Sequence, residues 1–470
     1  MPAPAQCRMV QWLYLLFTCC VVATATTQVP PEEIAALSAL YNNTKGEFWL
    51  WYDEEVAGPE WNFTVDAGGS FLDNPCSSSA VPNMTWQGVT CSQSPALCSS
   101  QNCHITRVDL TSYGLRGRLP PDIGNLLFLE RLFLVNNALT GPIPSEVGQL
   151  LGLEMLYLYS NSLTGPIPSE VGQLTALVQL ILYTNQLTGT IPSQVGDLTT
   201  LDFLYLYEND LTGCIPVEVG RLTALKHLVL NNNQLTGPIP IEVAKLTLLD
   251  VLHLQNNQLT GSIPSEVGQL TGLSLLYLYS NGLTGSIPSE LGALASLNYL
   301  ILNNNQLTDH IPVELGLLTA LQVFYLYNNQ LTGPIPAELG LLTSLQVLYF
   351  YDNSLTGMIP REMGQLISLD ALYLYNNELT GPLPCELGSL SSLELFICYG
   401  NQLTGSIPSE MGQMSALEVL ILDTNLLEGS IPGEVGHLTA LEVLYLYGNQ
   451  LTGSVPIEMG QLAALQLFIG

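Results

Sequence analysis

The stretch LEMLYLYSNSLTGPIPSEVGQL, residues 153–174, decides the fold because close copies of it recur along most of the chain. From Ile105 onward the sequence repeats every 24 residues without an insertion, and proline marks the register from Pro120 to Pro456. Fifteen complete or nearly complete units follow one another, and a sixteenth begins at Leu465. A fixed period of this length indicates a stacked solenoid, so it outweighs the several domains that 470 residues would otherwise suggest.

Each position of the unit has a physical role. Leucines alternate with outward residues such as Tyr157, which predicts a short strand with leucine inside. Stacked repeats share one core and form a parallel sheet with strands about 4.8 Å apart. Asn161 follows the strand, and we expect its amide to bind buried backbone groups, one asparagine per repeat. Gly165 is expected to have a positive φ, as is Asp309, which replaces glycine at this position.

Charge and motifs exclude several classes of function. The formal charge of −30, from 10 basic and 40 acidic residues, argues against nucleic acids and anionic membranes as partners. The five histidines occupy different repeat positions, and the sequence contains no nucleophile elbow, phosphate loop or metal-ligand spacing. We therefore expect no enzyme activity, no cofactor and no metal.

Carboxylates recur once in almost every unit, at one structural position. A unique active site would not repeat in this way, so we interpret them as a solvated ridge at the start of short helical turns. Weak cation binding along this ridge is the alternative. The ridge includes Glu146, Glu170, Glu218, Glu242 and Glu266.

The N-terminal region predicts secretion. Residues 1–25 form a signal peptide, with Arg8 as the positive charge, an uncharged stretch over 9–22 and a small-residue cleavage pattern at 23–25. An uncleaved anchor is the alternative. No later stretch has the pattern of a membrane span, so we expect a secreted or cell-surface protein. Three glycosylation sequons agree with secretion, at Asn42, Asn62 and Asn83.

Four cysteines cluster ahead of the repeats. In an oxidising compartment such a cluster predicts two disulfides, although a metal site that includes His104 is conceivable. Cys398 replaces a repeat leucine and is expected to be buried. The clustered cysteines are Cys76, Cys91, Cys98 and Cys103.

The unit L-x-x-L-x-L-x-x-N-x-L-T-G-x-I-P-x-E-x-G-x-L resembles the plant-type leucine-rich repeat of receptor-kinase ectodomains, receptor-like proteins and polygalacturonase inhibitors. The preceding region is similar to the N-terminal cap of that family, in ALSALY at 36–41 and in WQGVTC at 86–91. The resemblance covers roughly residues 32–470. It implies an α/β repeat solenoid, a right-handed superhelical horseshoe with a concave parallel sheet and convex 3₁₀ turns. It also implies ligand or protein binding, without naming a ligand.

This resemblance divides the chain into a signal peptide (1–25), a cap (26–104) and repeats (105–470). Terminal repeats normally need a polar cover, and the sequence ends inside a strand at Gly470. We therefore expect the sequence to be an incomplete gene product.

The cap also suggests the disulfide pairing. We expect Cys76 to pair with Cys91, because this pair brackets the Trp86 motif shared with the family. We expect Cys98 to pair with Cys103, closing a short loop that the usual cap lacks.

Tyrosines gather at the outward strand positions. The pattern Tyr-Leu-Tyr recurs, so most tyrosines of the chain share one face, where they could stack on a glycan or grip a peptide. Repeat duplication and cross-strand stacking would also produce this pattern. The pattern occurs at Tyr157/Tyr159, Tyr205/Tyr207, Tyr277/Tyr279, Tyr325/Tyr327, Tyr373/Tyr375 and Tyr445/Tyr447.

The ladder of tyrosines is interrupted near its middle, where the exposed residues are expected to be Lys226, His227, Val229, Asn231, His253 and Gln255, and then Tyr299, Ile301, Asn303 and Asn304. A specific contact would show as a departure of this kind, although drift in a tolerant unit would also explain it. Two histidines here would make binding sensitive to pH between about 5 and 8. The residues predicted to bind the ligand are Tyr205, Tyr207, Lys226, His227, His253, Tyr277, Tyr279 and Tyr299.

The sequence thus predicts an extracellular, non-catalytic recognition protein that holds a peptide, glycan or protein on its concave face. One alternative is an inhibitor of secreted hydrolases. Another is the ectodomain of a receptor kinase whose C-terminal part is missing. A third is a structural or ice-binding protein, which would present a flat ladder of threonine or asparagine.

Overall fold

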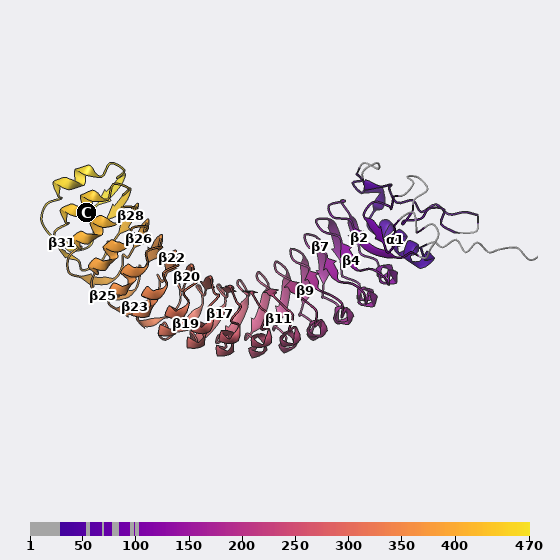
Figure 1. Cartoon of the computed structure of the whole chain (residues 1–470), viewed down its shortest axis with the longest axis horizontal. Coiled ribbons are helices and arrows are strands. Elements are labelled where there is room, and N and C mark those ends of the chain that lie inside the picture. The colour runs from indigo at the N-terminus through magenta and orange to yellow at the C-terminus, as the bar shows by residue number, and fades with distance from the viewer. Residues whose placement is uncertain (1–28, 53–56, 68–69, 78–83, 95–97, 99–102) are drawn as a thin grey trace, which may run out of the picture.

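The structure is a computed structural model that describes residues 29–52, 57–67, 70–77, 84–94, 98 and 103–470. The predicted signal peptide, residues 1–25, and the sequon asparagine Asn83 lie outside the described residues. Figure 1 shows the chain as an open arc, with helix α1 (Pro31–Asn43) near one end and the C-terminus at the other. The open arc agrees with the horseshoe shape that the sequence predicts.

Short strands, one per repeat, build the inner sheet. Seventeen of the described strands belong to it, and all pair in parallel except β1, which pairs antiparallel with β2. Neighbouring strands keep the 24-residue register, so that His253 lies opposite Tyr277. The strands are β1 (Val89–Cys91), β2 (Ile105–Asp109), β4 (Arg131–Phe133), β6 (Met155–Tyr157), β8 (Gln179–Ile181), β10 (Phe203–Tyr205), β12 (His227–Val229), β14 (Val251–His253), β16 (Leu275–Tyr277), β18 (Tyr299–Ile301), β20 (Val323–Tyr325), β22 (Val347–Tyr349), β24 (Ala371–Tyr373), β26 (Leu395–Ile397), β28 (Val419–Ile421), β30 (Val443–Tyr445) and β32 (Leu467–Ile469).

A second set of parallel strands, which the sequence did not lead us to expect, follows the turn after each inner strand. Its neighbours are staggered by two residues, so Thr236 pairs with Gln258 instead of with the next threonine. Gly237 then pairs with Leu259. These strands are β3 (Arg116–Arg118), β5 (Ala138–Gly141), β7 (Ser162–Gly165), β9 (Gln186–Gly189), β11 (Asp210–Gly213), β13 (Gln234–Gly237), β15 (Gln258–Gly261), β17 (Gly282–Ser286), β19 (Gln306–Thr308), β21 (Thr332–Pro334), β23 (Ser354–Gly357), β25 (Glu378–Pro382), β27 (Gln402–Thr404), β29 (Glu428–Gly429) and β31 (Gln450–Leu451).

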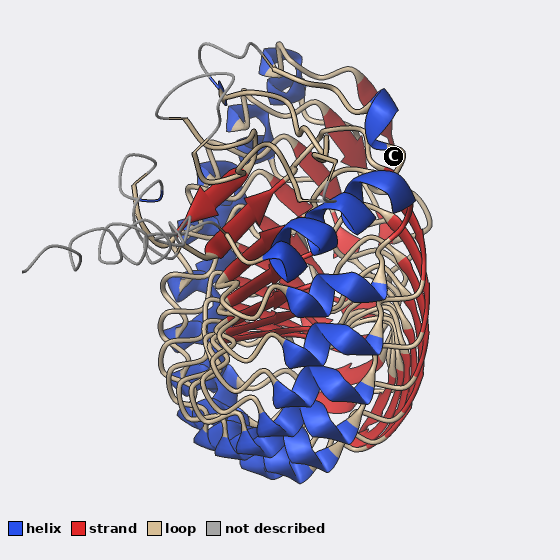
Figure 2. Ribbon diagram, turned by 90° about the vertical axis from the view of Figure 1, so that its right-hand side faces the viewer, coloured by secondary structure: helices blue, strands red, loops and turns tan. Residues whose placement is uncertain are grey.

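Short 3₁₀ turns complete each repeat on the outer side, and Figure 2 shows them in blue, stacked apart from the strands. In each repeat a proline in extended conformation precedes the turn, as Pro240 does, because its fixed φ suits entry into the turn. The turns are η1 (Gly46–Phe48), which belongs to the N-terminal region, and η2 (Pro121–Asn125), η3 (Ser145–Gln149), η4 (Ser169–Gln173), η5 (Ser193–Asp197), η6 (Val217–Arg221), η7 (Ile241–Lys245), η8 (Ser265–Gln269), η9 (Ser289–Ala293), η10 (Val313–Leu317), η11 (Ala337–Leu341), η12 (Arg361–Gln365), η13 (Cys385–Ser389), η14 (Ser409–Gln413), η15 (Gly433–His437) and η16 (Ile457–Gln461).

From η2 onward, consecutive turns pack tightly because glycine stands at the fourth position of each one except η7. At Gly268 a Cβ atom would lie 2.2 Å from the carbonyl oxygen of Glu290 in the next turn. The exception in η7 is Ala244, and η7 and η8 pack less closely than any other consecutive turns from η2 onward.

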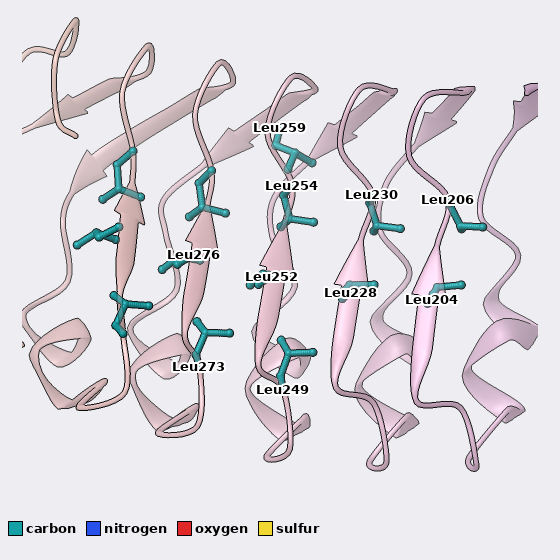
Figure 3. Close-up of a cluster of buried hydrophobic side chains, with 14 of the residues drawn as sticks. Leu204, Leu206, Leu228, Leu230, Leu249, Leu252, Leu254, Leu259, Leu273 and Leu276 are labelled. Atoms are coloured by element: carbon teal, nitrogen blue, oxygen red, sulfur yellow. The ribbon is translucent and has the colours of Figure 1, made fainter. Parts of the chain in front are cut away.

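The core is a continuous column of leucines. Figure 3 shows Leu228, Leu230, Leu252 and Leu254 pointing to the same side of successive strands, and all four are fully buried. The alternation of inward leucine with outward residues is therefore as predicted. Cys398, also fully buried, takes a leucine position in this column.

An asparagine ladder runs beside the leucines, as the sequence predicts. The Oδ1 atom of Asn257 accepts the backbone N–H of Leu235 at 2.9 Å. Its Nδ2 donates to the carbonyl oxygens of Leu230 and Leu254, each at 3.1 Å. Each asparagine thus joins its own repeat to the preceding one. Beyond the ladder, Gly165 and Asp309 have φ values of 77° and 65°, which confirms the expected positive φ.

The N-terminal region covers the first repeat. Helix α1 buries its apolar side, and its Glu33 carboxylate accepts the N–H of Ile105 at 2.8 Å and lies 2.7 Å from His104 Nδ1. Burial raises the pKa of Glu33. The indole N–H of Trp86 donates to Asp73 at 2.9 Å. Two disulfides have the predicted pairing, Cys76 with Cys91 and Cys98 with Cys103.

Candidate functional site

Two columns of side chains run along the concave face, one residue per repeat in each, and beside them the first residues of the inner strands, among them His227 and Tyr299, form a third. The first column holds Phe133, Tyr157, Ile181, Tyr205, Val229, His253, Tyr277, Ile301, Tyr325, Tyr349, Tyr373, Ile397, Ile421 and Tyr445. The second column, two residues later in each repeat, holds Val135, Tyr159, Tyr183, Tyr207, Asn231, Gln255, Tyr279, Asn303, Tyr327, Tyr351, Tyr375, Tyr399, Asp423 and Tyr447. Their positions follow from the parallel register, because each repeat step moves a side chain to the next strand.

Tyrosines of adjacent repeats stack on one another within each column. The ring centroids of Tyr327 and Tyr351 lie 4.3 Å apart with a 9° angle between the planes, and those of Tyr351 and Tyr375 also lie 4.3 Å apart. Each ring inside a stack therefore has both faces covered. It presents its edge and its hydroxyl group to solvent, so a sugar cannot stack on these faces.

Burial against neighbouring rings also affects the hydroxyl groups. It raises the pKa of Tyr375 to about 12, and it raises the pKa of Tyr183 and Tyr349 as well. The concave face therefore offers neutral hydroxyls that can both donate and accept hydrogen bonds.

Three of the predicted ligand contacts, Tyr205, Lys226 and His227, already have partners in the protein. The ammonium of Lys226 lies 2.9 Å from the Asp202 carboxylate, which offsets its charge. His227 Nδ1 lies 2.5 Å from the Tyr205 hydroxyl, and its Nε2 lies 3.7 Å from Asp250. The predicted positive spot is thus largely neutralised within the protein.

His253 is the predicted contact with a free polar atom. Its ring stacks on Tyr277 with centroids 4.3 Å apart and a 5° angle. Its Nε2 atom is buried and has no hydrogen-bond partner among the residues that the structure describes. The pKa of His253 is lowered to about 4, mainly by burial and to a smaller extent by the nearby His227. The predicted sensitivity between pH 5 and 8 therefore does not fit this histidine, because its environment penalises the protonated form.

The short residues in the interruption are buried, not exposed as predicted. Val229 and Gln255 are each 7% exposed, Asn231 8%, Ile301 6% and Asn303 1%. Asn303 lies between the taller Tyr279 and Tyr327 of its column, whereas Val229 and Gln255 each have a tyrosine on one side only. The side-chain oxygens of Gln255 and Asn303 are also buried without a partner in the described part of the chain. Sequence reasoning left these two amides out of the predicted site, although short polar residues between tyrosines were a visible signal.

The remaining predicted residues fall into two groups. Tyr277, Tyr279 and Tyr299 lie together, with Tyr299 edge-on to Tyr277 at 6.3 Å. Tyr207 stacks on Tyr183, on the other side of the interruption from Tyr277. A ligand that contacts both groups must span the repeats of His227 and His253, which the sequence prediction also assumed.

Other predicted features lie away from this face. Glu266 and its equivalents lie in the first part of the convex turns, where the sequence predicted a ridge of carboxylates. The sequon asparagines Asn42 and Asn62 are exposed. No cluster of three or more metal-ligating side chains occurs in the residues that the structure describes. Within that same part of the chain, no helix has the length and apolar character needed to cross a bilayer.

Comparisons with known proteins agree with this architecture. A family model described as a leucine-rich repeat region matches residues 209–332, and a Leucine Rich Repeat model matches 152–174, 344–366, 368–390 and 440–462. A probable leucine-rich repeat receptor-like serine/threonine-protein kinase of Arabidopsis thaliana is 36% identical over 118 residues. That match spans 24% of this chain and 9% of the kinase.

Solved structures match over longer stretches. The plant peptide hormone receptor RGFR1, in complex with RGF2, is 36% identical with a TM-score of 0.75, over 77% of this chain and 57% of the receptor. An LRR protein of Leptospira interrogans is 35% identical with a TM-score of 0.61, over 77% of this chain and 95% of that protein. A plant ice-binding protein is 28% identical with a TM-score of 0.51, over 66% and 90% of the two chains.

These matches agree with the structural features described above, namely the 24-residue unit, the inner parallel sheet, the asparagine ladder and the convex 3₁₀ turns. The chain belongs to the leucine-rich-repeat family, with repeats of the plant type.

Proposed function

We propose that this protein is an extracellular, non-catalytic recognition protein that binds a peptide along its concave face. The contacts centre on His253, Gln255 and Asn303, with Tyr205, Tyr207, Tyr277, Tyr279 and Tyr299 around them. Four buried side-chain polar atoms have no hydrogen-bond partner among the described residues, and the observation that carries the proposal is that three of them, in His253, Gln255 and Asn303, lie within three consecutive repeats of this face. A buried polar group without a partner costs about 1–3 kcal/mol, so a ligand that supplies the missing hydrogen bonds gains affinity.

A peptide suits this face better than a glycan. Stacked tyrosines keep their ring faces covered and expose edges and hydroxyls. A peptide carries N–H and C=O groups at every residue, which match hydroxyls and amide oxygens along a line of repeats. The solved receptor with 36% identity is a peptide hormone receptor, which supports the same class of ligand for this chain.

An ice-binding role receives less support from the arrangement of threonines. Threonine recurs once per repeat in the second set of strands, as in Thr236 and Thr260. The two-residue stagger pairs Thr236 with Gln258, so threonines of adjacent strands lie on a diagonal about 7–8 Å apart. This stagger weighs against a flat threonine ladder at the spacing of one strand.

A binding experiment tests the proposal on the secreted chain. A phage-displayed library of random dodecapeptides is selected on the immobilised protein, and affinities of enriched peptides are measured by interferometry. The double variant His253→Ala with Gln255→Ala should weaken binding at least tenfold. A matched double variant on the convex ridge, Glu266→Ala with Glu290→Ala, should leave binding unchanged. Weakened binding by the convex variant alone would place the site on the other face and refute the proposal.

A further inference from the structure

The regular stacking of the second column is interrupted for a single repeat at Asn303. Tyrosines flank this repeat in both columns, with Tyr277 and Tyr279 on one side and Tyr325 and Tyr327 on the other. Between them lies a pocket of about 430 Å³, a volume within the usual range for ligand sites. We call it the tyrosine slot.

The width of the tyrosine slot follows from the ladder itself. Adjacent rings in the second column stand 4.3 Å apart. Two repeat steps therefore leave roughly 9 Å between the ring planes of Tyr279 and Tyr327, which is twice the stacking distance. One planar ring fits between them and meets a free face on each side. Inside the stacks both faces are covered, so the slot is a place where the ladder can accept a ring.

The floor of the slot is apolar apart from one amide. Ile301 and Val323 lie beside Asn303, whose side chain is 1% exposed. The Oδ1 atom of Asn303 is buried and has no hydrogen-bond partner among the described residues. A group that enters the slot from the open side of the arc points its tip at this amide.

We propose that the tyrosine slot receives a tyrosine side chain of the bound peptide. The inference rests on the proposed function and identifies one side chain of the ligand. The ring of the ligand tyrosine continues the stack between Tyr279 and Tyr327, and its hydroxyl hydrogen-bonds to Asn303. A phenol both donates and accepts, so it satisfies the amide in either orientation of the Asn303 side chain.

Other side chains satisfy the slot less completely. Phenylalanine stacks but leaves the buried amide without a partner, so it binds more weakly than tyrosine. Aliphatic side chains fill the volume but have no aromatic ring that could stack on Tyr279 and Tyr327. No side chain that lines the slot is charged, so neither a cationic nor an anionic tip finds a counterion there.

A peptide, and not a free phenol, accounts for the neighbouring unpaired atoms. His253 and Gln255 lie two repeats before Asn303, which corresponds to roughly 10 Å along the sheet. An extended chain covers this distance in about three residues. A peptide that places tyrosine in the slot therefore reaches both atoms with a polar residue about three positions away.

The same column has another single-repeat interruption, at Asp423, which differs from the tyrosine slot in its lining. Asp423 also lies between tyrosines, Tyr399 and Tyr447, but Ile397 replaces one of the two flanking tyrosines in the first column. The Asp423 carboxylate accepts a hydrogen bond from the Thr424 hydroxyl at 3.0 Å. This interruption has a floor that is already hydrogen-bonded, so it serves as a matched control.

The test compares variants that fill the two interruptions. The displayed dodecapeptide library is selected on the wild type, on Asn303→Tyr, which completes the stack and closes the slot, and on Asp423→Tyr. We expect tyrosine at one fixed position in peptides selected by the wild type and by Asp423→Tyr. We expect this enrichment to disappear with Asn303→Tyr. Equal tyrosine enrichment on Asn303→Tyr, or none on the wild type, would overturn the inference, whereas the proposed function fails only if no peptide binds the concave face.

A second measurement compares two peptides on the same protein, so a partial loss of folded protein affects both affinities equally. An enriched peptide and its Tyr→Phe analogue should differ at least tenfold in affinity for the wild type, and this ratio should fall to about one for Asn303→Ala. A ratio that stays at tenfold in Asn303→Ala would remove the amide from the proposal. Free N-acetyltyrosinamide that binds as tightly as the peptide would overturn the assignment of a peptide ligand.

Discussion

Replacing Asn257 by alanine tests the asparagine ladder one rung at a time. The substitution leaves the buried N–H of Leu235 without its acceptor, and it removes three hydrogen bonds to carbonyl oxygens, the longest of them 3.4 Å. An unpaired buried donor costs about 1–3 kcal/mol, and each lost bond to a carbonyl adds about 0.5–1.5 kcal/mol. Because these carbonyls retain other partners, we expect a loss of about 2–4 kcal/mol in the free energy of opening between these two repeats.

Native-state hydrogen exchange measures this loss where it occurs. In a solenoid each repeat contacts its neighbours, so a local opening is resolved better than one global midpoint. We expect the Leu235 amide to exchange roughly 30-fold to 1,000-fold faster in Asn257→Ala, with repeats far along the chain unchanged.

The adjacent residue supplies the control. Asn256 has a φ of 54° and an exposed side chain that donates to Asn232 at 2.7 Å. Glycine adopts this φ without strain, so Asn256→Gly should change stability by less than about 0.5 kcal/mol. If Asn256→Gly accelerates exchange at Leu235 as much as Asn257→Ala does, the ladder is not what joins the repeats.

Three further predictions concern the core, the pH response and the convex turns. In chemical denaturation, Leu254→Ala should lower the free energy of unfolding by about 2–5 kcal/mol because it leaves a cavity, whereas Tyr279→Ala on the open face should lower it by about 1 kcal/mol. Equal losses in the two variants would contradict the inward position of leucine. Burial lowers the pKa of His253 from its usual value near 6.5 to about 4, so the folded state binds fewer protons than the unfolded state in this range. The contribution of His253 to stability is therefore fully present above pH 6.5 and falls as the pH drops toward 4. In melting scans over this range, His253→Gln should lose less stability than the wild type. Equal losses of melting temperature in the two proteins would contradict this prediction. Gly268→Ala should lower the free energy of unfolding by more than about 2 kcal/mol, because its Cβ would lie 2.2 Å from a carbonyl oxygen. The exposed Gly272→Ala is the control: its Cβ would lie 3.7 Å from the nearest carbonyl oxygen, so this variant should melt at the same temperature as the wild type.

The sequence predicted the parts of the fold that a strict period determines. Leucine at fixed spacing must point inward, and an asparagine that recurs beside it must bind the same backbone groups in each repeat. The second set of strands was missed because segments such as QLTG, residues 258–261, are too short to show an alternation of their own. Their pairing arises from how the repeats stack, which no single repeat contains.

The candidate site was predicted in outline but not in detail. The interruption at His253 was visible because it departs from a nearly identical background. The ion pair of Lys226 with Asp202 depends on side chains one repeat apart, and the burial of Asn303 depends on the height of neighbouring tyrosines. These properties belong to the assembled face, so the residue types at each position were not enough to show which polar atoms remain unpaired.

The alanine in turn η7 has a mechanical consequence. Inner strands are held at a fixed distance by their hydrogen bonds, while the methyl group of Ala244 keeps η7 farther from η8 than glycine would. Where two repeats are held farther apart on the convex side while their strands stay hydrogen-bonded on the concave side, the solenoid bends more sharply. This bend lies behind His227 and His253, so one methyl group on the back of the arc influences how strongly the front is curved where the aromatic ladder is interrupted.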